Sequence, residues 1–273
     1  MQLELIQIET NTTPLDGLFY LPVNEKPKGV VMICHGNTMN FYVGAARFLP
    51  PALCEMGFAC LSFNRRGHDI MGIRDSRMAE GAAFQTTAEG IEDNEYAAEW
   101  IKAKGYETPI LVGHSNGGFL AVQHVVNNPD TPALVLLSAH SGGRTAENLA
   151  QKTGLLGGNK TSELREKAEN MVSNGQGDDL MILPGWWYVA TARSYIDRLT
   201  TMPDTVESAA QVTCPVLFIR GDQEIREAYP AEDFAANCSG NCDVEILKEC
   251  DHFYRGKEDV VTEQVCNWLS RNL

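Results

Sequence analysis

Short apolar runs recur along the chain. They are separated by stretches in which apolar residues are spaced as in amphipathic helices. Five runs are almost wholly apolar and rich in β-branched or aromatic residues, which is typical of strands buried on both faces. They cover residues 30–34, 58–63, 109–113, 133–138 and 215–220. Helical patterns lie between them, notably at 87–104 and 117–127. Strands that alternate with helices predict parallel crossovers and a doubly wound sheet.

Weaker patterns at the two ends of the chain extend this sheet. Residues 3–8 and 15–20 flank a polar NTTP stretch, and together they predict an N-terminal antiparallel hairpin. A last strand is expected at 243–248 and a last amphipathic helix at 257–273. These elements complete a mostly parallel central sheet flanked by helices.

The alternation of strands and helices is interrupted between residues 140 and 212. This stretch carries no strand signal, only Gly-rich turns and helical segments such as SELREKAENMV and YVATARSYIDRL. We interpret residues 140–212 as a helical cap, inserted between the core segments 1–139 and 213–273 of one α/β domain. Trp186 and Trp187 in this cap either border a substrate pocket or pack the cap onto the core.

The segment ILVGHSNGGF places the motif G-x-S-x-G directly after an apolar strand and directly before a helix. Gly113 and Gly117 flank Ser115 and permit a sharp turn whose crowded backbone would reject side chains. The turn lifts the Ser115 hydroxyl off the sheet edge, and the helix N-terminus directs amide groups toward it. This context predicts a nucleophile, and the alternative is an ordinary glycine turn.

A serine hydroxyl is a poor nucleophile at neutral pH and needs a base, which in turn needs a partner to orient it. Among the six histidines, His252 stands out because it lies in the loop ECDHFY between the last strand and the last helix. The chain order serine, acid, histidine would place the base there. A surface-loop histidine is the alternative interpretation, and His35 as a spare base is a weaker one.

The acid is expected directly after the strand at 215–220, where the sequence reads Gly-Asp-Gln-Glu. Asp222 and Glu224 are both candidates, and Asp251 is a third. An aspartate often makes a turn contact in its own loop instead, which weakens the case for Asp222.

Acyl transfer also requires hydrogen-bond donors for a developing oxyanion. The loop after the first buried strand reads CHGNT, and the helix after the nucleophile begins near Asn116. We predict that the backbone amides of Asn37 and Asn116 form an oxyanion hole, whereas His35 and Gly36 shape the loop.

Five segments together resemble the α/β-hydrolase superfamily over nearly the whole chain. They are HG at 35–36, NRRGHD at 64–69, GHSNGG at 113–118, GDQE at 221–224 and DHF at 251–253. The resemblance implies the α/β-hydrolase fold, with the acid three positions after the glycine of GDQE, which favours Glu224 over Asp222. Glutamate is a minority choice at that position. The resemblance also implies a structural role for Arg66, Gly67 and His68.

The net charge of the chain disfavours some classes of binding partner. With 22 basic and 36 acidic residues the net charge is −14, so nucleic acid and anionic membrane surfaces would be repelled. The same charge mildly favours neutral or cationic substrates, unless the pocket itself carries a different charge. The sequence lacks a phosphate-binding glycine loop and a zinc-protease motif, so we expect no cofactor and no metal.

The cysteines and the N-terminal segment indicate in which cellular compartment the protein is expected. Five of the eight cysteines lie in expected strands and helices, and we interpret them as buried reduced thiols. Cys238, Cys242 and Cys250 lie close together, but a zinc site would need a further pair of ligands. The N-terminal segment lacks the pattern of a signal peptide and no apolar run is long enough to span a membrane, so we expect a cytoplasmic protein.

These observations favour a serine hydrolase that cleaves a carboxylic ester or related acyl bond of a small molecule through an acyl-enzyme. Trp186, Trp187 and Phe41 are the expected substrate-binding residues, and they predict a hydrophobic substrate. A carbon–carbon bond hydrolase acting on a vinylogous diketone is the alternative, and a perhydrolase is a further one. Serine at the turn argues against dehalogenases and epoxide hydrolases, which use aspartate there. A non-catalytic binding protein on the same fold is the alternative of another class.

Overall fold

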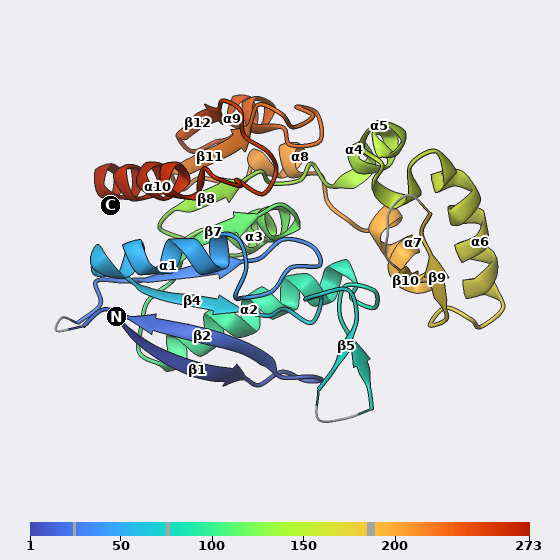
Figure 1. Ribbon diagram of the computed structural model, residues 1–273, viewed down its shortest axis with the longest axis horizontal. Coiled ribbons are helices and arrows are strands. Elements are labelled where there is room, and N and C mark those ends of the chain that lie inside the picture. The colour runs from blue at the N-terminus through green and yellow to red at the C-terminus, as the bar shows by residue number, and fades with distance from the viewer. Residues whose placement is uncertain (24–25, 75–76, 185–188) are drawn as a thin grey trace.

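The computed structural model describes residues 1–23, 26–74, 77–184 and 189–273. Within these residues, eight strands form one sheet in the order β1-β2-β4-β3-β7-β8-β11-β12 (Figure 1). Strand β2 is antiparallel to both of its neighbours, β1 and β4, and every later pair of neighbours is parallel. The predicted N-terminal hairpin and the mostly parallel sheet are therefore confirmed.

The bounds of the elements follow the apolar pattern closely. The strands of the sheet are β1 (Gln2–Ile8), β2 (Leu15–Leu21), β3 (Val30–Cys34), β4 (Ala59–Phe63), β7 (Ile110–His114), β8 (Leu134–Leu137), β11 (Val216–Gly221) and β12 (Cys242–Leu247). The helices that cover it are α1 (Ala45–Glu55), α2 (Thr87–Ala103), α3 (Asn116–Asn127), α8 (Thr205–Ala209), α9 (Ala231–Asn237) and α10 (Glu258–Asn272). A separate pair of short strands comprises β5 (Gly72–Ile73) and β6 (Ala79–Glu80).

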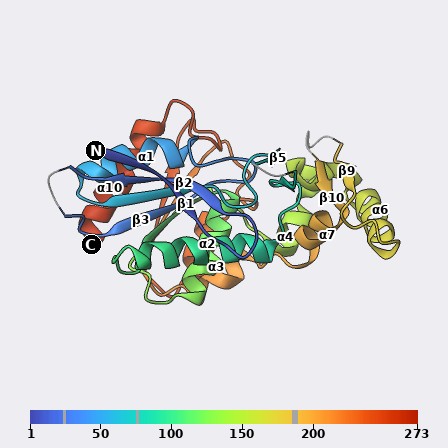
Figure 2. The same ribbon diagram turned by 90° about the horizontal axis from the view of Figure 1, so that it is seen from below.

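Alternating side chains along the strands build two apolar layers, one on each face of the sheet. In β3, Val31 and Ile33 belong to the layer that includes α1 and α10, whereas Val30, Met32 and Cys34 belong to the layer of α2 and α3. Figure 2 shows these two helix pairs on opposite faces of the sheet. Because both faces are covered, the strands are apolar at successive positions instead of alternating with polar ones.

Between β8 and β11 the chain leaves the sheet and forms an insertion with its own apolar core, which lies to one side of the molecule (Figures 1 and 2). Its elements are α4 (Gly143–Asn148), α5 (Ala150–Thr153), the 3-10 helix η1 (Leu155–Lys160), α6 (Thr161–Ser173), β9 (Leu180–Ile182), β10 (Val189–Thr191) and α7 (Ala192–Thr200). The division of the chain into a core and a cap at residues 140 and 212 stays a prediction.

The expectation of a purely helical insertion is wrong in one respect, because β9 and β10 pair as an antiparallel ribbon. Residues 189–191 were expected to be helical. The helix α7 begins only at Ala192, since Thr191 caps it by accepting a hydrogen bond from the backbone N–H of Ser194 at 3.1 Å. Within the described part of the chain, no helix combines the length and apolarity needed to cross a bilayer.

Candidate active site

The turn between β7 and α3 holds Ser115 in a backbone conformation that side chains rarely adopt, with φ 55° and ψ −120°. The flanking glycines make this turn possible. A Cβ on Gly113 would lie 2.5 Å from the carbonyl oxygen of Gly117, and a Cβ on Gly117 would overlap the carbonyl of Cys34. The predicted sharp turn is therefore present, and it presents the serine at the carboxyl edge of the sheet.

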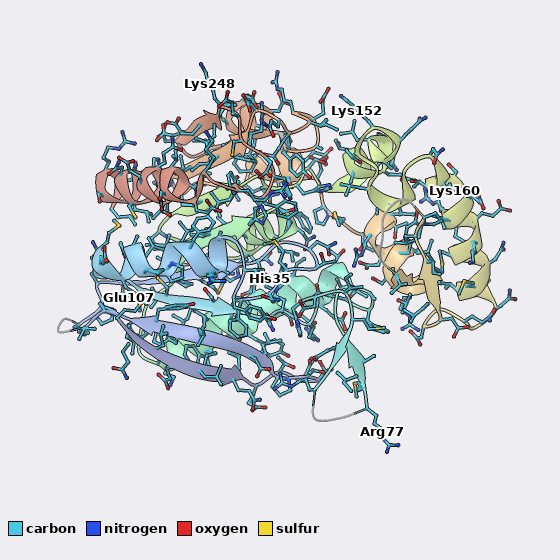
Figure 3. The ribbon with its side chains drawn as sticks, viewed as in Figure 1. His35, Arg77, Glu107, Lys152, Lys160 and Lys248 are labelled. Atoms are coloured by element: carbon cyan, nitrogen blue, oxygen red, sulfur yellow. The ribbon has the colours of Figure 1, made fainter. Side chains whose placement is uncertain are left out.

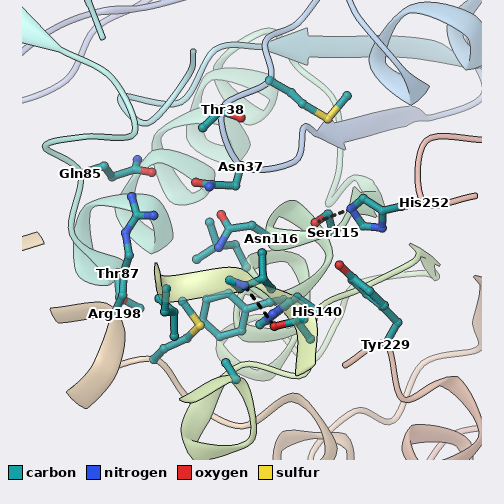
Figure 4. A pocket seen from close by; sticks show the side chains of 18 of the residues that line it. Asn37, Thr38, Gln85, Thr87, Ser115, Asn116, His140, Arg198, Tyr229 and His252 are labelled. Atoms are coloured by element: carbon teal, nitrogen blue, oxygen red, sulfur yellow. Dashed lines mark hydrogen bonds between the residues drawn. The ribbon is translucent and has the colours of Figure 1, made fainter. Parts of the chain in front are cut away.

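Three side chains that are far apart in the sequence meet at this edge. The Nε2 atom of His252 lies 3.0 Å from Oγ of Ser115 (Figure 4), and its Nδ1 atom lies 2.7 Å from Oε1 of Glu224. Both distances are those of hydrogen bonds. The Glu224 side chain is only 2% exposed, so its charge acts on the imidazole with little screening by water. This contact keeps a proton on Nδ1 and leaves Nε2 to accept the serine proton.

The Glu224 carboxylate is held by groups that the sequence did not reveal. Its Oε2 atom accepts hydrogen bonds from Oγ of Ser138 at 2.6 Å and from the backbone N–H of Gly221 at 2.8 Å. The Ser138 hydroxyl in turn lies 2.7 Å from the Tyr254 hydroxyl. Ser138 directly follows β8, beside the end of β11, so strand order and not sequence spacing brings it to the acid.

The other two candidate acids are not brought to the imidazole. The exposed carboxylate of Asp222 accepts a hydrogen bond from the backbone N–H of Cys250 at 3.2 Å, and backbone hydrogen bonds of this kind lower its pKa. Asp251 accepts one from the N–H of Phe253 at 3.0 Å and pairs with Arg255 at 2.6 Å. Both aspartates therefore stabilise the loop that carries the histidine instead of orienting its ring.

The two loops predicted to bind an oxyanion lie next to the serine. Asn37 and Asn116 line the same cavity as Ser115 (Figure 4). The guanidinium of Arg65, which is 1% exposed, donates to the carbonyl of His35 and to Oδ1 of Asn116 at 3.5 Å. Arg65 thus links both loops from beneath. The assignment of the two backbone amides as oxyanion donors stays a prediction.

A cavity of about 480 Å³ opens at the serine and extends toward the insertion. Much of its lining is apolar and comes from both core and insertion, namely Met39, Phe119, Leu120, Ala146, Leu155, Leu156, Met202 and Phe253. The expectation for Phe41 is wrong, because Phe41 is not among the lining residues. Its backbone N–H is bound by Asn64 at 2.9 Å, and its ring contacts that of Tyr42. Trp186 and Trp187 lie outside the described residues.

Three aromatic residues around the imidazole were not predicted. The Tyr229 ring lies 4.7 Å from the ring of His252, between ring centroids. His114 donates from Nε2 to the carbonyl of His252 at 2.8 Å and so anchors the loop. His140 lines the cavity and accepts from the N–H of Gly142 through Nδ1 at 3.0 Å, so its Nε2 carries the hydrogen. Only His114, inside the G-H-S-N-G motif, was marked by its position in the sequence.

Two histidines are buried as neutral imidazoles. His35 donates from Nδ1 to the carbonyl of Gly36 at 2.8 Å and accepts at Nε2 from the N–H of Arg65, so it has no place for a second proton. Burial lowers the pKa of His35 well below its usual value and lowers the pKa of His114 to about 3. Figure 3 shows His35 deep in the molecule, with the charged residues labelled there at its periphery.

These histidines predict a loss of stability in mild acid. Below about pH 6.5 the unfolded chain binds protons at both positions and the folded chain does not, so each histidine costs about 2 kcal/mol by pH 5. Burial raises the pKa of Asp93 to about 6. As the pH falls to 5, the folded chain therefore protonates Asp93 while the unfolded chain largely does not, which stabilises the folded state by about 1.4 kcal/mol. Burial also lowers the pKa of His140 to about 4, which adds a loss of about 2 kcal/mol, so the expected net loss is about 4–5 kcal/mol.

Urea unfolding at pH 7.5 and pH 5.0 measures this difference in the free energy of unfolding. The variant His114→Gln, which removes one titrating group, should reduce the pH dependence by about 2 kcal/mol whatever its effect at pH 7.5. Equal stability of the wild-type protein at the two pH values would contradict the prediction.

The residues that meet at the sheet edge suit proton transfer and nucleophilic attack. Among the described residues, no group of three or more His, Cys, Asp or Glu side chains is arranged to hold a metal ion. The site itself consists of a strained serine, a histidine within hydrogen-bond distance of it and a buried carboxylate behind the histidine.

Comparisons with known proteins identify the family and the fold. The family model described as serine aminopeptidase, S33, matches residues 25–254. The α/β hydrolase GrgF from Penicillium sp. sh18 is 13% identical, with a TM-score of 0.74, and the match covers 100% of this chain and 99% of that one. A highly thermostable carboxyl esterase from Bacillus coagulans, in complex with glycerol, is 15% identical, with a TM-score of 0.71 and the same coverage. These likenesses confirm the expected α/β-hydrolase fold.

One curated relative matches a shorter stretch. The acylamino-acid-releasing enzyme of Rattus norvegicus is 28% identical over 113 residues, which is 40% of this chain and 15% of that enzyme. The matched stretch is thus a small part of the length of the curated relative.

Proposed function

Since the chain belongs to the serine aminopeptidase S33 family of α/β hydrolases, it is a hydrolase, and we propose that it cleaves a carboxylic ester or related acyl bond of a small molecule through an acyl-enzyme on Ser115. The observation that carries this proposal is the hydrogen-bonded series Ser115, His252 and Glu224, with distances of 3.0 and 2.7 Å, whose first two members line a cavity. A serine activated in this way is a nucleophile toward carbonyl carbon.

In the proposed reaction, Oγ of Ser115 attacks the substrate carbonyl while its proton passes to Nε2 of His252. The imidazolium that forms is stabilised by the buried carboxylate of Glu224. The amides of Asn37 and Asn116 donate to the oxyanion of the tetrahedral intermediate. The intermediate expels the alcohol, which takes the proton from His252. A water molecule then repeats the sequence on the acyl-enzyme and releases the carboxylic acid.

The cavity favours an ester over an unblocked peptide. An aminopeptidase binds the free α-amino group of its substrate, a cation that a carboxylate side chain would recognise. No Asp or Glu is among the described residues that line the cavity. The large share of apolar lining supports a substrate with an aryl or alkyl portion.

A panel of p-nitrophenyl esters from acetate to octanoate, assayed beside a vinylogous diketone, tests the proposal. We expect ester turnover with an initial burst of p-nitrophenol close to one per protein, because an acyl-enzyme forms before it is hydrolysed. Faster turnover of butyrate to octanoate than of acetate would agree with the apolar lining.

Two other outcomes would replace the proposal. Cleavage of the diketone alone would indicate a carbon–carbon bond hydrolase. Folded protein that cleaves neither substrate and is not labelled at Ser115 by a fluorophosphonate probe would indicate a binding protein. A control variant, Ser173→Ala, changes an exposed serine on α6 and should be labelled like the wild type.

A further inference from the structure

The cavity differs in charge from the molecule as a whole. The chain has a net charge of −14. Among the described residues that line the cavity there is an arginine, Arg198, and no carboxylate side chain. Glu224 lies behind the His252 ring and is not part of the lining. A ligand in the cavity therefore meets positive charge, although the net charge of the chain favours neutral or cationic substrates.

Arg198 lies across the cavity from the reacting groups. It comes from the last turn of α7 in the insertion, whereas Ser115 and His252 come from the core. Figure 4 shows Arg198 beside Gln85 and Thr87, on the opposite side of the pocket from the Ser115–His252 pair. The guanidinium donates to the carbonyl of Ala82, which helps to fix its position. Its planar fork of five N–H donors matches the two oxygens of a carboxylate.

The neighbouring acid in the sequence, Asp197, is bound elsewhere. Its Oδ2 atom accepts from the backbone N–H and the hydroxyl of Thr87 at 2.6 and 2.7 Å, and its Oδ1 atom accepts from the hydroxyl of Thr201 at 2.7 Å. Asp197 thus lies at the N-terminus of α2, where the helix dipole stabilises a negative charge. It fixes α7 against α2, and so positions Arg198, without itself lining the cavity.

We propose that Arg198 binds a carboxylate of the substrate, at the end of the cavity remote from the bond that is cleaved. The substrate class is then an ester that carries a free carboxylate, such as a half-ester of a medium-chain dicarboxylic acid. Leu155, Leu156 and Met202 line the cavity and would contact the alkyl or aryl portion between the two polar ends. This inference rests on the proposed function, because it takes Ser115 as the place of cleavage.

Matched pairs of esters test the inference. The mono-p-nitrophenyl esters of adipic and pimelic acid are compared with the same compounds methylated on the free carboxyl group. Acetyl esters of 4-hydroxybenzoic acid and of its methyl ester place the carboxylate on the alcohol side instead. In at least one series, the wild-type kcat/KM should be about 10–100 times higher for the anionic member, as expected for a charge-assisted contact in a partly apolar site.

Variants of Arg198 distinguish a specific contact of its guanidinium from effects of the substitution on folding or on overall activity. Arg198→Gln should lower kcat/KM for the preferred anionic ester at least tenfold and change the neutral ester less than threefold. Arg198→Lys keeps the charge without the fork, and should give an intermediate preference. The matched control is Arg193→Gln. Arg193 is an exposed arginine on the same helix, and it pairs with Asp178 outside the cavity. It should behave like the wild type, and circular dichroism checks that each variant is folded.

The outcomes distinguish this inference from the proposed function. Equal kcat/KM for anionic and neutral esters, unchanged by Arg198→Gln, would overturn the carboxylate site and leave the serine hydrolase intact. If no ester is cleaved, the proposed function fails, and binding of adipate measured by calorimetry then decides the inference. Binding that is lost in Arg198→Gln and kept in Arg193→Gln would support a carboxylate site, and absence of binding to the wild type would overturn it.

Discussion

Replacing Ser115 by alanine is expected to lower kcat for ester hydrolysis by about four to six orders of magnitude, and His252→Ala should cost about the same factor. The reason is that the two side chains act as one unit. The imidazole at 3.0 Å has no proton to take once the hydroxyl is gone, and the hydroxyl without the imidazole is a poor nucleophile. The double variant is therefore expected to be no slower than the slower single variant.

Steady-state turnover of p-nitrophenyl butyrate by the three variants measures this result, with Ser173→Ala as the control expected to match the wild type. Binding of the uncleaved ester to Ser115→Ala, followed by calorimetry, should stay within a few-fold of the dissociation constant that the concentration dependence of the burst rate gives for the wild type, because the lost interactions form mainly in the transition state. Turnover by Ser115→Ala within a factor of ten of the wild type would show that cleavage does not pass through this hydroxyl. Independent losses that multiply in the double variant would show that the two residues do not act together.

The central strands of the sheet could be predicted because they are covered on both sides, unlike the more exposed edge strands β1 and β12. The runs at 30–34 and 215–220 are apolar throughout, as the two core layers require, and the observed strands begin and end within a residue of them. The helix α1 could not be predicted in the same way. It contains Pro50 and Pro51, and proline inside a helix removes backbone hydrogen bonds. The carbonyl of Ala46, deprived of its usual partner by Pro50, accepts instead from Ser62 of β4 at 2.9 Å.

The sequence predicted those site residues that lie in recognisable loops and turns between the expected strands and helices. Ser115 is marked by its glycines and His252 by its place after the last strand. The sequence alone left Glu224 and Asp222 open, since both follow β11 within three residues. The groups that hold Glu224 became visible only with the strand order, because β8 and β11 are neighbours in the sheet and far apart in the chain. The charge of the cavity was likewise hidden, since it depends on which few of the many charged residues line the cavity.

The two acids after β11 are expected to differ by about 300-fold to 10⁴-fold in their effect on turnover. Glu224→Gln should lower kcat by about 10³–10⁴-fold, because a neutral amide at 2.7 Å from Nδ1 neither stabilises the imidazolium nor enforces the reactive tautomer. Asp222→Asn should change kcat by no more than about threefold, since its exposed carboxylate meets the backbone N–H of Cys250 and an amide oxygen can accept the same bond.

Both variants remove one charge from the same loop, so each serves as the matched control for the other. A third variant, Glu224→Asp, keeps the charge but shortens the side chain by one methylene, and should fall between Glu224→Gln and the wild type. Kinetics at saturating ester give kcat, and thermal unfolding checks that the loop remains folded. Equal losses in Glu224→Gln and Asp222→Asn would contradict the assignment. A larger loss in Asp222→Asn would mean that the loop rearranges during the reaction, with Asp222 replacing Glu224 as the partner of His252.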